Sequence, residues 1–164
     1  PKEDRLVIPS PKVSTYDKEP KMSAPKIAQA VKDVTTKNGH GYRFILINFA
    51  NPDMLGHTGI IPSAVKGIET TDQALETVVK AIRSQGGACV ITADHGNSEE
   101  MLDPVTGEIS TSHSNNRVPF IVTGPAGHFE SQQLQSGILA DIAPTVLKLM
   151  GIPKPSAMTG KTLI

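Results

Sequence analysis

Continuous apolar runs that alternate with helix-length segments constrain the fold of this chain more than any other feature of its sequence. The runs have the length of strands and span residues 42–49, 88–93 and 118–122. The segments with apolar residues at helical spacing span residues 24–37, 62–84 and 138–150. Uninterrupted apolar strands are typical of sheets covered on both faces, and strands that alternate with helices predict an α/β fold. We therefore expect α/β architecture with a mostly parallel sheet flanked by helices.

The remaining segments are expected to be irregular. Residues 1–22 contain four prolines, which restrict φ and disfavour helix just before them. We expect an extended N-terminal segment there, in which only residues 5–8 could form a short strand. Between Glu99 and His113, the turn-forming residues 103–107 separate two short runs and predict a small hairpin.

Composition excludes several classes of function. Sixteen Lys and Arg balance sixteen Asp and Glu, so no overall field attracts nucleic acid or an anionic membrane. No apolar run approaches the roughly 18 residues of a membrane span. The single cysteine, Cys89, lies in an apolar run, which excludes an internal disulfide and suits a reducing compartment. We expect a cytoplasmic protein that binds neither nucleic acid nor membrane.

Two clusters of Asp and His follow directly after predicted buried strands. The first places Asp53 and His57 four residues apart, a spacing that points both side chains the same way on a turn of helix. The second places Asp94 and His95 side by side, and the predicted hairpin carries His113 as a third contributor. Because ligands in open α/β sheets bind beyond the carboxyl ends of the strands, these side chains are expected to share one site.

Two carboxylates and three imidazoles are more ligands than one catalytic ion needs, because such an ion takes about three from the protein. Mixed oxygen and nitrogen ligands suit Mn²⁺ and Zn²⁺, and two ions a few ångströms apart can clamp a transferring phosphoryl group. The set therefore predicts two-metal phosphoryl transfer. Structural interpretations stay open for each part: Asp53 as a turn cap, the Asp94–His95 pair as a hydrogen-bonded turn, and His113 as a surface histidine. His40 and His128 have no carboxylate neighbour and are left out of the set.

Several strings give the sequence a family resemblance that covers essentially the whole chain. They are residues 10–13 (SPKV), 16–17 (YD), 22–24 (MSA), 48–59 (NFANPDMLGHTG), 92–97 (TADHGN) and 144–147 (PTVL). With these strings the sequence resembles the 2,3-bisphosphoglycerate-independent phosphoglycerate mutases. The string around Asp94 recurs across the alkaline phosphatase superfamily, whereas the long string around Asp53 is highly specific to the mutases.

The resemblance implies an alkaline-phosphatase-like fold with two Mn²⁺ ions, for which Mg²⁺, Co²⁺ or Zn²⁺ could substitute. It implies interconversion of 3-phosphoglycerate and 2-phosphoglycerate through a phosphoserine intermediate. Residue by residue, it implies that one ion is bound by Asp53, His57 and His113 and the other by Asp94 and His95. The further ligands of the second ion in the family, an aspartate near the N-terminus and the nucleophilic serine, match no residue of this chain. The inserted domain that orients the glycerate is also missing.

Residues 1–164 are thus expected to be the C-terminal portion of a metal-binding phosphatase-like domain, with no catalytic nucleophile of their own. One hypothesis is that the parent protein is a monomeric cytoplasmic mutase. In that case this chain is inactive without the N-terminal part of the parent. A second makes the parent a related metal-dependent phosphatase, phosphodiesterase or phosphopentomutase that shares the string at residues 94–96. A third makes the isolated chain a non-catalytic fragment, because missing strands would leave an open sheet edge.

Overall fold

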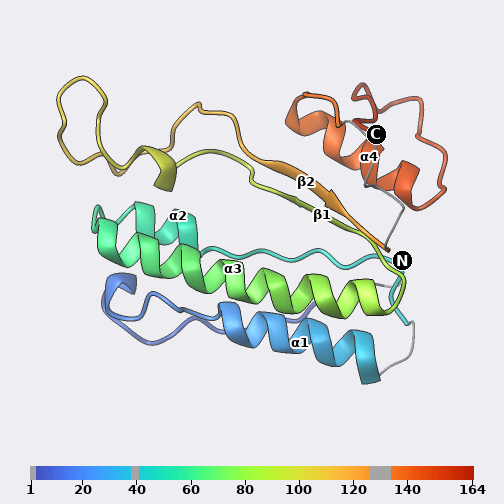
Figure 1. Cartoon of the computed structure of the whole chain (residues 1–164), viewed down its shortest axis with the longest axis horizontal. Coiled ribbons are helices and arrows are strands. Elements are labelled where there is room, and N and C mark those ends of the chain that lie inside the picture. Colours follow the sequence, from blue (N-terminus) through green and yellow to red (C-terminus); the bar gives the residue numbers. More distant parts are fainter. Residues whose placement is uncertain (1–2, 38–40, 126–133) are drawn as a thin grey trace.

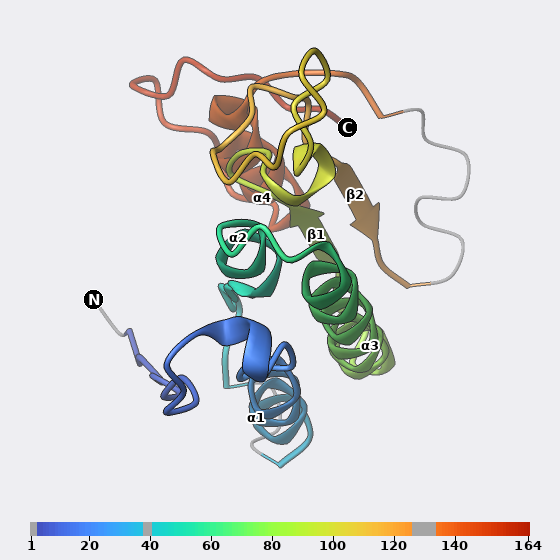
Figure 2. The ribbon, with the colours of Figure 1, turned by 90° about the vertical axis from the view of Figure 1, so that its left-hand side faces the viewer.

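The computed structural model of the chain describes residues 3–37, 41–125 and 134–164, so His40 and His128 lie outside the described residues. The helices are α1 (Ala24–Lys37), α2 (Asn51–Gly56), α3 (Ile61–Ser84) and α4 (Ile142–Leu149). The strands are β1 (Cys89–Thr92) and β2 (Phe120–Thr123), and single 3-10 turns lie at Tyr16–Lys18, Ser98–Glu100 and Leu139–Asp141. In Figures 1 and 2, α1 and α3 lie on one side of the two strands and α4 lies on the other. None of the described helices combines the length and hydrophobicity that a membrane crossing requires.

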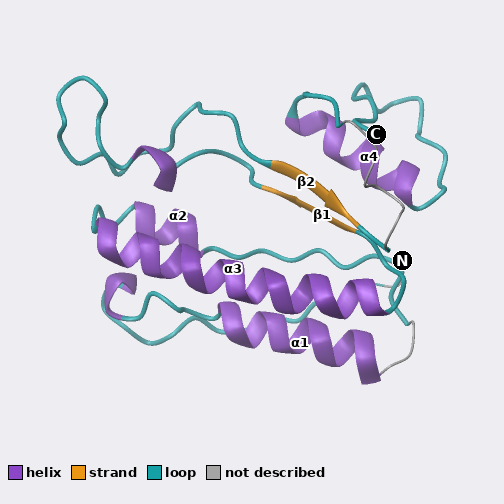
Figure 3. Cartoon of the chain, viewed as in Figure 1, coloured by secondary structure: helices purple, strands orange, loops and turns teal. Residues whose placement is uncertain are grey.

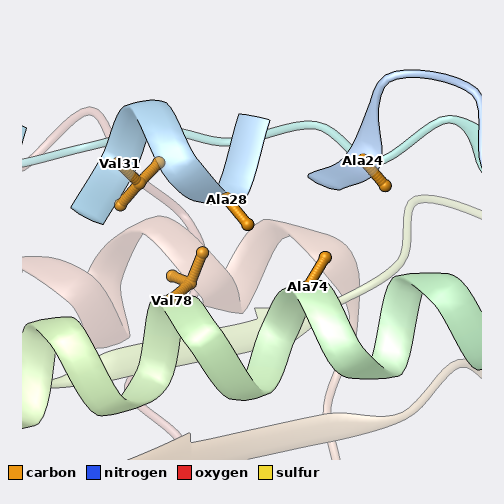
Figure 4. Close-up of a cluster of buried hydrophobic side chains, with 5 residues drawn as sticks. All are labelled: Ala24, Ala28, Val31, Ala74 and Val78. Atoms are coloured by element: carbon orange, nitrogen blue, oxygen red, sulfur yellow. The ribbon is translucent and has the colours of Figure 1, made fainter. Parts of the chain in front are cut away.

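The first and third helices, which the sequence predicted, pack against each other through small side chains. The buried residues of this core are Ala24, Ala28, Val31, Ala74 and Val78 (Figure 4). Small side chains at the contact let two helix axes approach closely. The apolar side chains of α3 are not all buried in this core, since Val65 and Ile68 are 50% and 42% exposed.

The mostly parallel sheet that the sequence predicted is not confirmed. The described sheet has two strands, and they are antiparallel, with Cys89 opposite Thr123 and Thr92 opposite Phe120. Their positions agree with two of the three predicted apolar runs. Figure 3 shows how short both strands are beside the loops that connect them.

The third apolar run, residues 42–49, is not a strand in the structure, and neither are residues 5–8. Within residues 42–49, the side chains of Phe44 and Leu46 are 55% and 85% exposed, while Ile47 and Phe49 pack on the core between α1 and α3. A strand needs a neighbouring backbone that satisfies its N–H and C=O groups. No segment within the described residues pairs with this run, so its apolar pattern alone was not enough to make it a strand.

The helix that carries two of the candidate ligands is anchored on α3. Leu55 of α2 is completely buried and packs with Ala64 and Met101. Close approach is possible because residue 67 of α3 is glycine, and a Cβ there would overlap the Leu55 side chain. At the start of α2, the buried Asn51 amide donates hydrogen bonds to the carbonyls of Pro20 and Lys21, at 2.8 and 2.9 Å. These contacts give α2 a fixed orientation.

The predicted hairpin is confirmed. An isolated antiparallel bridge joins Leu102 and Ile109, and the Asp103 N–H donates to the Glu108 carbonyl at 2.8 Å.

The end of the chain is tied to α4 by Asp141, which is 3% exposed. Its carboxylate accepts hydrogen bonds from the N–H groups of Ile138 and Lys161, at 2.9 and 2.8 Å.

These bonds make Asp141 a source of pH-dependent stability. The N–H groups of Ile138 and Lys161 lower the pKa of the Asp141 carboxyl from its usual value. A depressed folded-state pKa means that the stabilisation is present above the unfolded pKa of about 3.9 and is lost as pH falls through the folded value. In the protein that contains this chain, Asp141→Asn is expected to lower the thermal midpoint at pH 7, and this difference should shrink below about pH 4. Thermal melts across pH measure it, with the exposed Asp72→Asn as control, and an equal difference at pH 7 and pH 3 would count against this role.

Candidate metal centre

The two candidate ligands from the first sequence cluster are carried by α2 and its C-terminal cap. Asp53 is in the first turn of this helix, and His57 is the residue that caps its C-terminus. Because the two are four residues apart, their side chains meet on one side of the helix. The distance from His57 Nε2 to Asp53 Oδ1 is 3.3 Å.

Antiparallel pairing of the strands brings His95 and His113 together. The segment after β1 and the segment before β2 lie at the same end of the pair, and they continue to pair at Gly96 and Ser114. The Ser114 N–H donates to the Gly96 carbonyl at 2.9 Å. The rings of His95 and His113 are stacked, with centroids 3.7 Å apart and an interplanar angle of 22°.

Three ligand atoms converge on one point at this end of the sheet. His113 Nε2 lies 3.1 Å from Asp53 Oδ1 and 3.1 Å from His57 Nε2, and the third side of the triangle is the 3.3 Å contact between Asp53 and His57. Bonds of 2.0–2.1 Å to a tetrahedral ion place neighbouring ligand atoms about 3.3–3.4 Å apart. Electron-rich atoms this close repel one another unless a cation or a proton lies among them. The three side chains therefore fit a divalent ion.

A backbone carbonyl orients one of these ligands. His57 Nδ1 lies 2.7 Å from the Thr111 carbonyl oxygen. A carbonyl can only accept a hydrogen bond, so Nδ1 carries the proton and Nε2 keeps a free electron pair. Metal-binding histidines are generally oriented in this way by a partner on the other ring nitrogen. Thr111 was not singled out by the sequence, because its contact is made by the backbone and leaves no residue-type signal.

Asp94 and His95 are less tightly grouped than the other three candidates. Asp94 Oδ2 lies 3.6 Å from His95 Nε2, and the Asp94 side chain is 82% exposed. Ligand atoms of Asp53, His95 and His113 do lie within 4.8 Å of one another. This group overlaps the tighter triangle of Asp53, His57 and His113, whose distances are closer to those of metal coordination. His95 adjoins this triangle through its stacked contact with His113, and Asp94 contacts His95.

Asn97 is a further residue of the centre to which the sequence assigned no role. Its side-chain amide is 5% exposed and donates to Asp53 Oδ1 at 2.8 Å and to the Asp53 carbonyl at 3.2 Å. The amide oxygen has no hydrogen-bond partner in the described part of the chain, and it faces Gly56 so closely that a Cβ at position 56 would overlap it. Asn97 thus holds the Asp53 carboxylate in place, and only glycine fits opposite.

The Glu99 carboxylate joins the two loops that carry His95 and His113. It accepts hydrogen bonds from the Asn97 N–H at 2.7 Å, from the Ser114 hydroxyl, and from the Asn116 amide at 3.1 Å. Partial burial would raise the pKa of Glu99, but hydrogen bonds from Ser114, its own N–H, Asn116 and Asn97 outweigh that effect and lower the pKa to about 2. Glu99 is therefore ionised at any physiological pH.

The candidate ligands lie on an open surface. The side chains of His57 and His113 are 39% and 48% exposed. A cavity of about 800 Å³ in the described structure is formed elsewhere, and none of the five candidate ligands lines it; its lining residues are Arg117, Ser136, Gly137, Ile138, Asp141, Thr159, Gly160 and Lys161. Within the described residues, the candidate ligands therefore form an open wall rather than an enclosed pocket.

Comparison with known proteins relates the chain to a family of metalloenzymes. The model of the metalloenzyme superfamily matches residues 1–154. The 2,3-bisphosphoglycerate-independent phosphoglycerate mutase of Rhodopseudomonas palustris is 51% identical over 164 residues, which are 100% of this chain and 31% of the relative. The enzyme of the same name from Thermomicrobium roseum is 49% identical over 166 residues, again with 100% and 31% coverage. The chain thus spans about a third of the length of the curated relatives it matches.

A solved structure has the same fold. A crystal structure of Leishmania mexicana phosphoglycerate mutase at low cobalt concentration superposes with a TM-score of 0.82 at 30% identity. The match covers 96% of this chain and 31% of that chain. The predicted alkaline-phosphatase-like metalloenzyme fold is confirmed at this level, although the parallel arrangement of the sheet is not.

Proposed function

Because this chain belongs to the metalloenzyme superfamily, we propose that it supplies the metal-binding wall of the active site of a 2,3-bisphosphoglycerate-independent phosphoglycerate mutase. The reaction is the interconversion of 3-phosphoglycerate and 2-phosphoglycerate, a step of glycolysis and gluconeogenesis, through a phosphoserine intermediate. Identity of about half over the whole chain to mutases supports the reaction. The observation that carries the proposal is the triangle formed by Asp53 Oδ1, His57 Nε2 and His113 Nε2.

In this proposal the three side chains have distinct roles at one ion, which we assign as Mn²⁺, with Mg²⁺, Co²⁺ or Zn²⁺ as substitutes. Asp53 supplies negative charge, and its Oδ1 is held by the Asn97 amide. His57 presents Nε2 because its Nδ1 proton is engaged by the Thr111 carbonyl. His113 comes from the segment before β2 and completes the triangle. Divalent ions at such a centre lower the pKa of an attacking hydroxyl and neutralise phosphoryl oxygens.

A second ion is assigned to Asp94 and His95, of which His95 stacks on His113 of this triangle. Two protein ligands are fewer than the three that catalytic ions commonly take, so the remaining ligands must come from another part of the protein. The exposed carboxylate of Asp94 is compatible with such a partner. We propose that a nucleophilic serine and a further aspartate outside residues 1–164 complete this second site.

No serine of this chain is proposed as the nucleophile. The Ser98 hydroxyl donates to the Pro52 carbonyl, and the Ser114 hydroxyl donates to Glu99, so both serve structural hydrogen bonds. The segment that orients the glycerate would also belong to the remaining two thirds of the protein, because the chain spans 31% of its mutase relatives. We propose that the whole protein is a cytoplasmic monomer and that residues 1–164 alone are inactive.

Turnover in ¹⁸O-labelled water tests the reaction class with the protein that contains this chain. A mutase is expected to convert 3-phosphoglycerate into 2-phosphoglycerate without added bisphosphoglycerate and without releasing labelled inorganic phosphate. A related phosphatase or phosphodiesterase would instead release inorganic phosphate. EDTA is expected to abolish turnover and Mn²⁺ to restore it, because the proposed centre depends on divalent ions. Mutase activity that is insensitive to EDTA would contradict the proposal.

A further inference from the structure

Three consecutive residues, 97–99, connect the elements that carry the proposed ligands. The Asn97 side chain reaches Asp53 on α2. The Ser98 hydroxyl donates to the carbonyl of Pro52, the neighbour of Asp53. The Glu99 carboxylate faces the other way, toward the segment that follows His113. The segment 97–99 is therefore hydrogen-bonded to the surroundings of two ligands that lie 60 residues apart in sequence.

Glu99 contacts residues that flank His113 in the chain. Its Oε1 accepts hydrogen bonds from the Ser114 hydroxyl and the Asn116 amide, and its Oε2 accepts the Asn97 N–H. Ser114 is the residue directly after His113, and its backbone is paired with Gly96. A Cβ at position 96 would overlap both the Ser114 hydroxyl and the Glu99 carboxylate. The two loops therefore approach each other closely at the point where Glu99 joins them.

Glu99 is suited to this connecting role and not to binding the ion. Donors from three other residues already engage its two oxygens, and its pKa of about 2 reflects these hydrogen bonds together with that from its own N–H. Hydrogen bonds to an ionised carboxylate are stronger than those between neutral groups. A charged acceptor that three donors share would hold the loops in one arrangement before any ion arrives, which reduces the cost of ordering the site on binding.

We propose that Glu99 is a positioning residue that presents His113 to Asp53 and His57 and so raises the affinity of the centre for a divalent ion. The inference rests on the proposed metal centre but not on the mutase reaction. Glu100 provides a matched comparison, because it is the next residue along the chain and carries the same charge. Its carboxylate accepts a hydrogen bond from the Asn116 amide at 2.9 Å, without the bonds that Glu99 accepts from Ser114 and Asn97.

The test is a calorimetric titration of the protein that contains this chain. The protein is first freed of other metals and then titrated with Co²⁺. Glu99→Gln preserves the shape of the side chain but removes its charge and one acceptor oxygen. We expect its dissociation constant for Co²⁺ to rise about 10- to 100-fold, the range known for partners that orient metal ligands. Glu100→Gln is expected to leave the dissociation constant unchanged. Saturating Co²⁺ should restore the visible absorption spectrum of the bound ion in Glu99→Gln, because all ligands are still present.

The following results of these titrations would overturn the proposal. Unchanged affinity in Glu99→Gln would remove the role, and equal losses in Glu99→Gln and Glu100→Gln would indicate a general charge effect. If Glu99→Gln does not fold by circular dichroism, Ser114→Ala, which removes one donor to Glu99, must show weaker Co²⁺ binding. Asp53→Asn separates the two proposals. If it binds Co²⁺ as tightly as the unmodified protein, the metal centre and the positioning role both fail, whereas loss in Asp53→Asn with none in Glu99→Gln defeats positioning alone.

Discussion

Replacing Asp53 with asparagine is expected to have the largest effect on metal binding of any single substitution in this chain. Asp53 Oδ1 is the common neighbour of His57 Nε2 and His113 Nε2, at 3.3 and 3.1 Å, and it is the only carboxylate of that triangle. Asparagine keeps the shape and can still accept the Asn97 amide, so the change removes charge with little change in packing. We expect the affinity for Mn²⁺ to fall by more than the roughly 100-fold that loss of an orienting partner can cost.

The loss of Mn²⁺ affinity in Asp53→Asn should also lower the turnover of the protein that contains this chain, because phosphoryl transfer at such centres depends on the charge of the ions. Calorimetry with Mn²⁺ and assays of 3-phosphoglycerate conversion measure the two effects. Asp72→Asn, an exposed change on α3, is the control for loss of one negative charge. Full Mn²⁺ affinity in Asp53→Asn would rule out Asp53 as a ligand.

Gly56→Ala is expected to have the second largest effect. The added Cβ would overlap the Asn97 amide oxygen, and Asn97 is buried, so the side chain has little room to move. Overpacking of this kind costs about 1–3 kcal/mol. It should also displace the amide that holds Asp53, so both the thermal midpoint and the affinity for Mn²⁺ should decrease.

A double-mutant cycle identifies the cause of the Gly56→Ala effect. In an Asn97→Ala background the overlapping atoms are absent, so adding Gly56→Ala should lower the thermal midpoint much less than it does in the unmodified protein. Thermal melts of the four proteins provide the measurement. Equal losses in both backgrounds would show that the cost arises from α2 itself and not from its contact with Asn97.

Local patterns predicted α1, α3 and α4 well, but not the short α2, because helical spacing is a property of the segment itself and is clear only in longer segments. The predicted range 62–84 differs from α3 at only one end, and the 3-10 turn and α4 together cover most of the range predicted at 138–150. Strand pairing depends on partners far away in the chain. The run at residues 42–49 has the apolar pattern of a strand, yet no described segment pairs with it, and β1 and β2 pair antiparallel where parallel strands were expected.

The sequence identified the candidate ligands, whereas the residues that hold them became visible only in three dimensions. Asp53 and His57 stand out because a carboxylate and an imidazole at helical spacing follow directly after an apolar run. The contact from Asn97 to Asp53 spans 44 residues, and that from Thr111 to His57 spans 54. Such contacts have no local signal, and the Thr111 contact is made by the backbone. We also expected His95 to join the site through parallel strands, but the antiparallel pairing of β1 and β2 brings it to His113.

The position of the bound ion is the most direct test of the central claim that Asp53, His57 and His113 form a metal site. Crystals of the protein that contains this chain, grown with Mn²⁺, would locate the ion by its anomalous scattering. We predict a peak about 2.0–2.2 Å from Asp53 Oδ1, His57 Nε2 and His113 Nε2, the distances usual for such ligands. An occupied Mn²⁺ site elsewhere in the protein, with no peak among these three atoms, would contradict the claim.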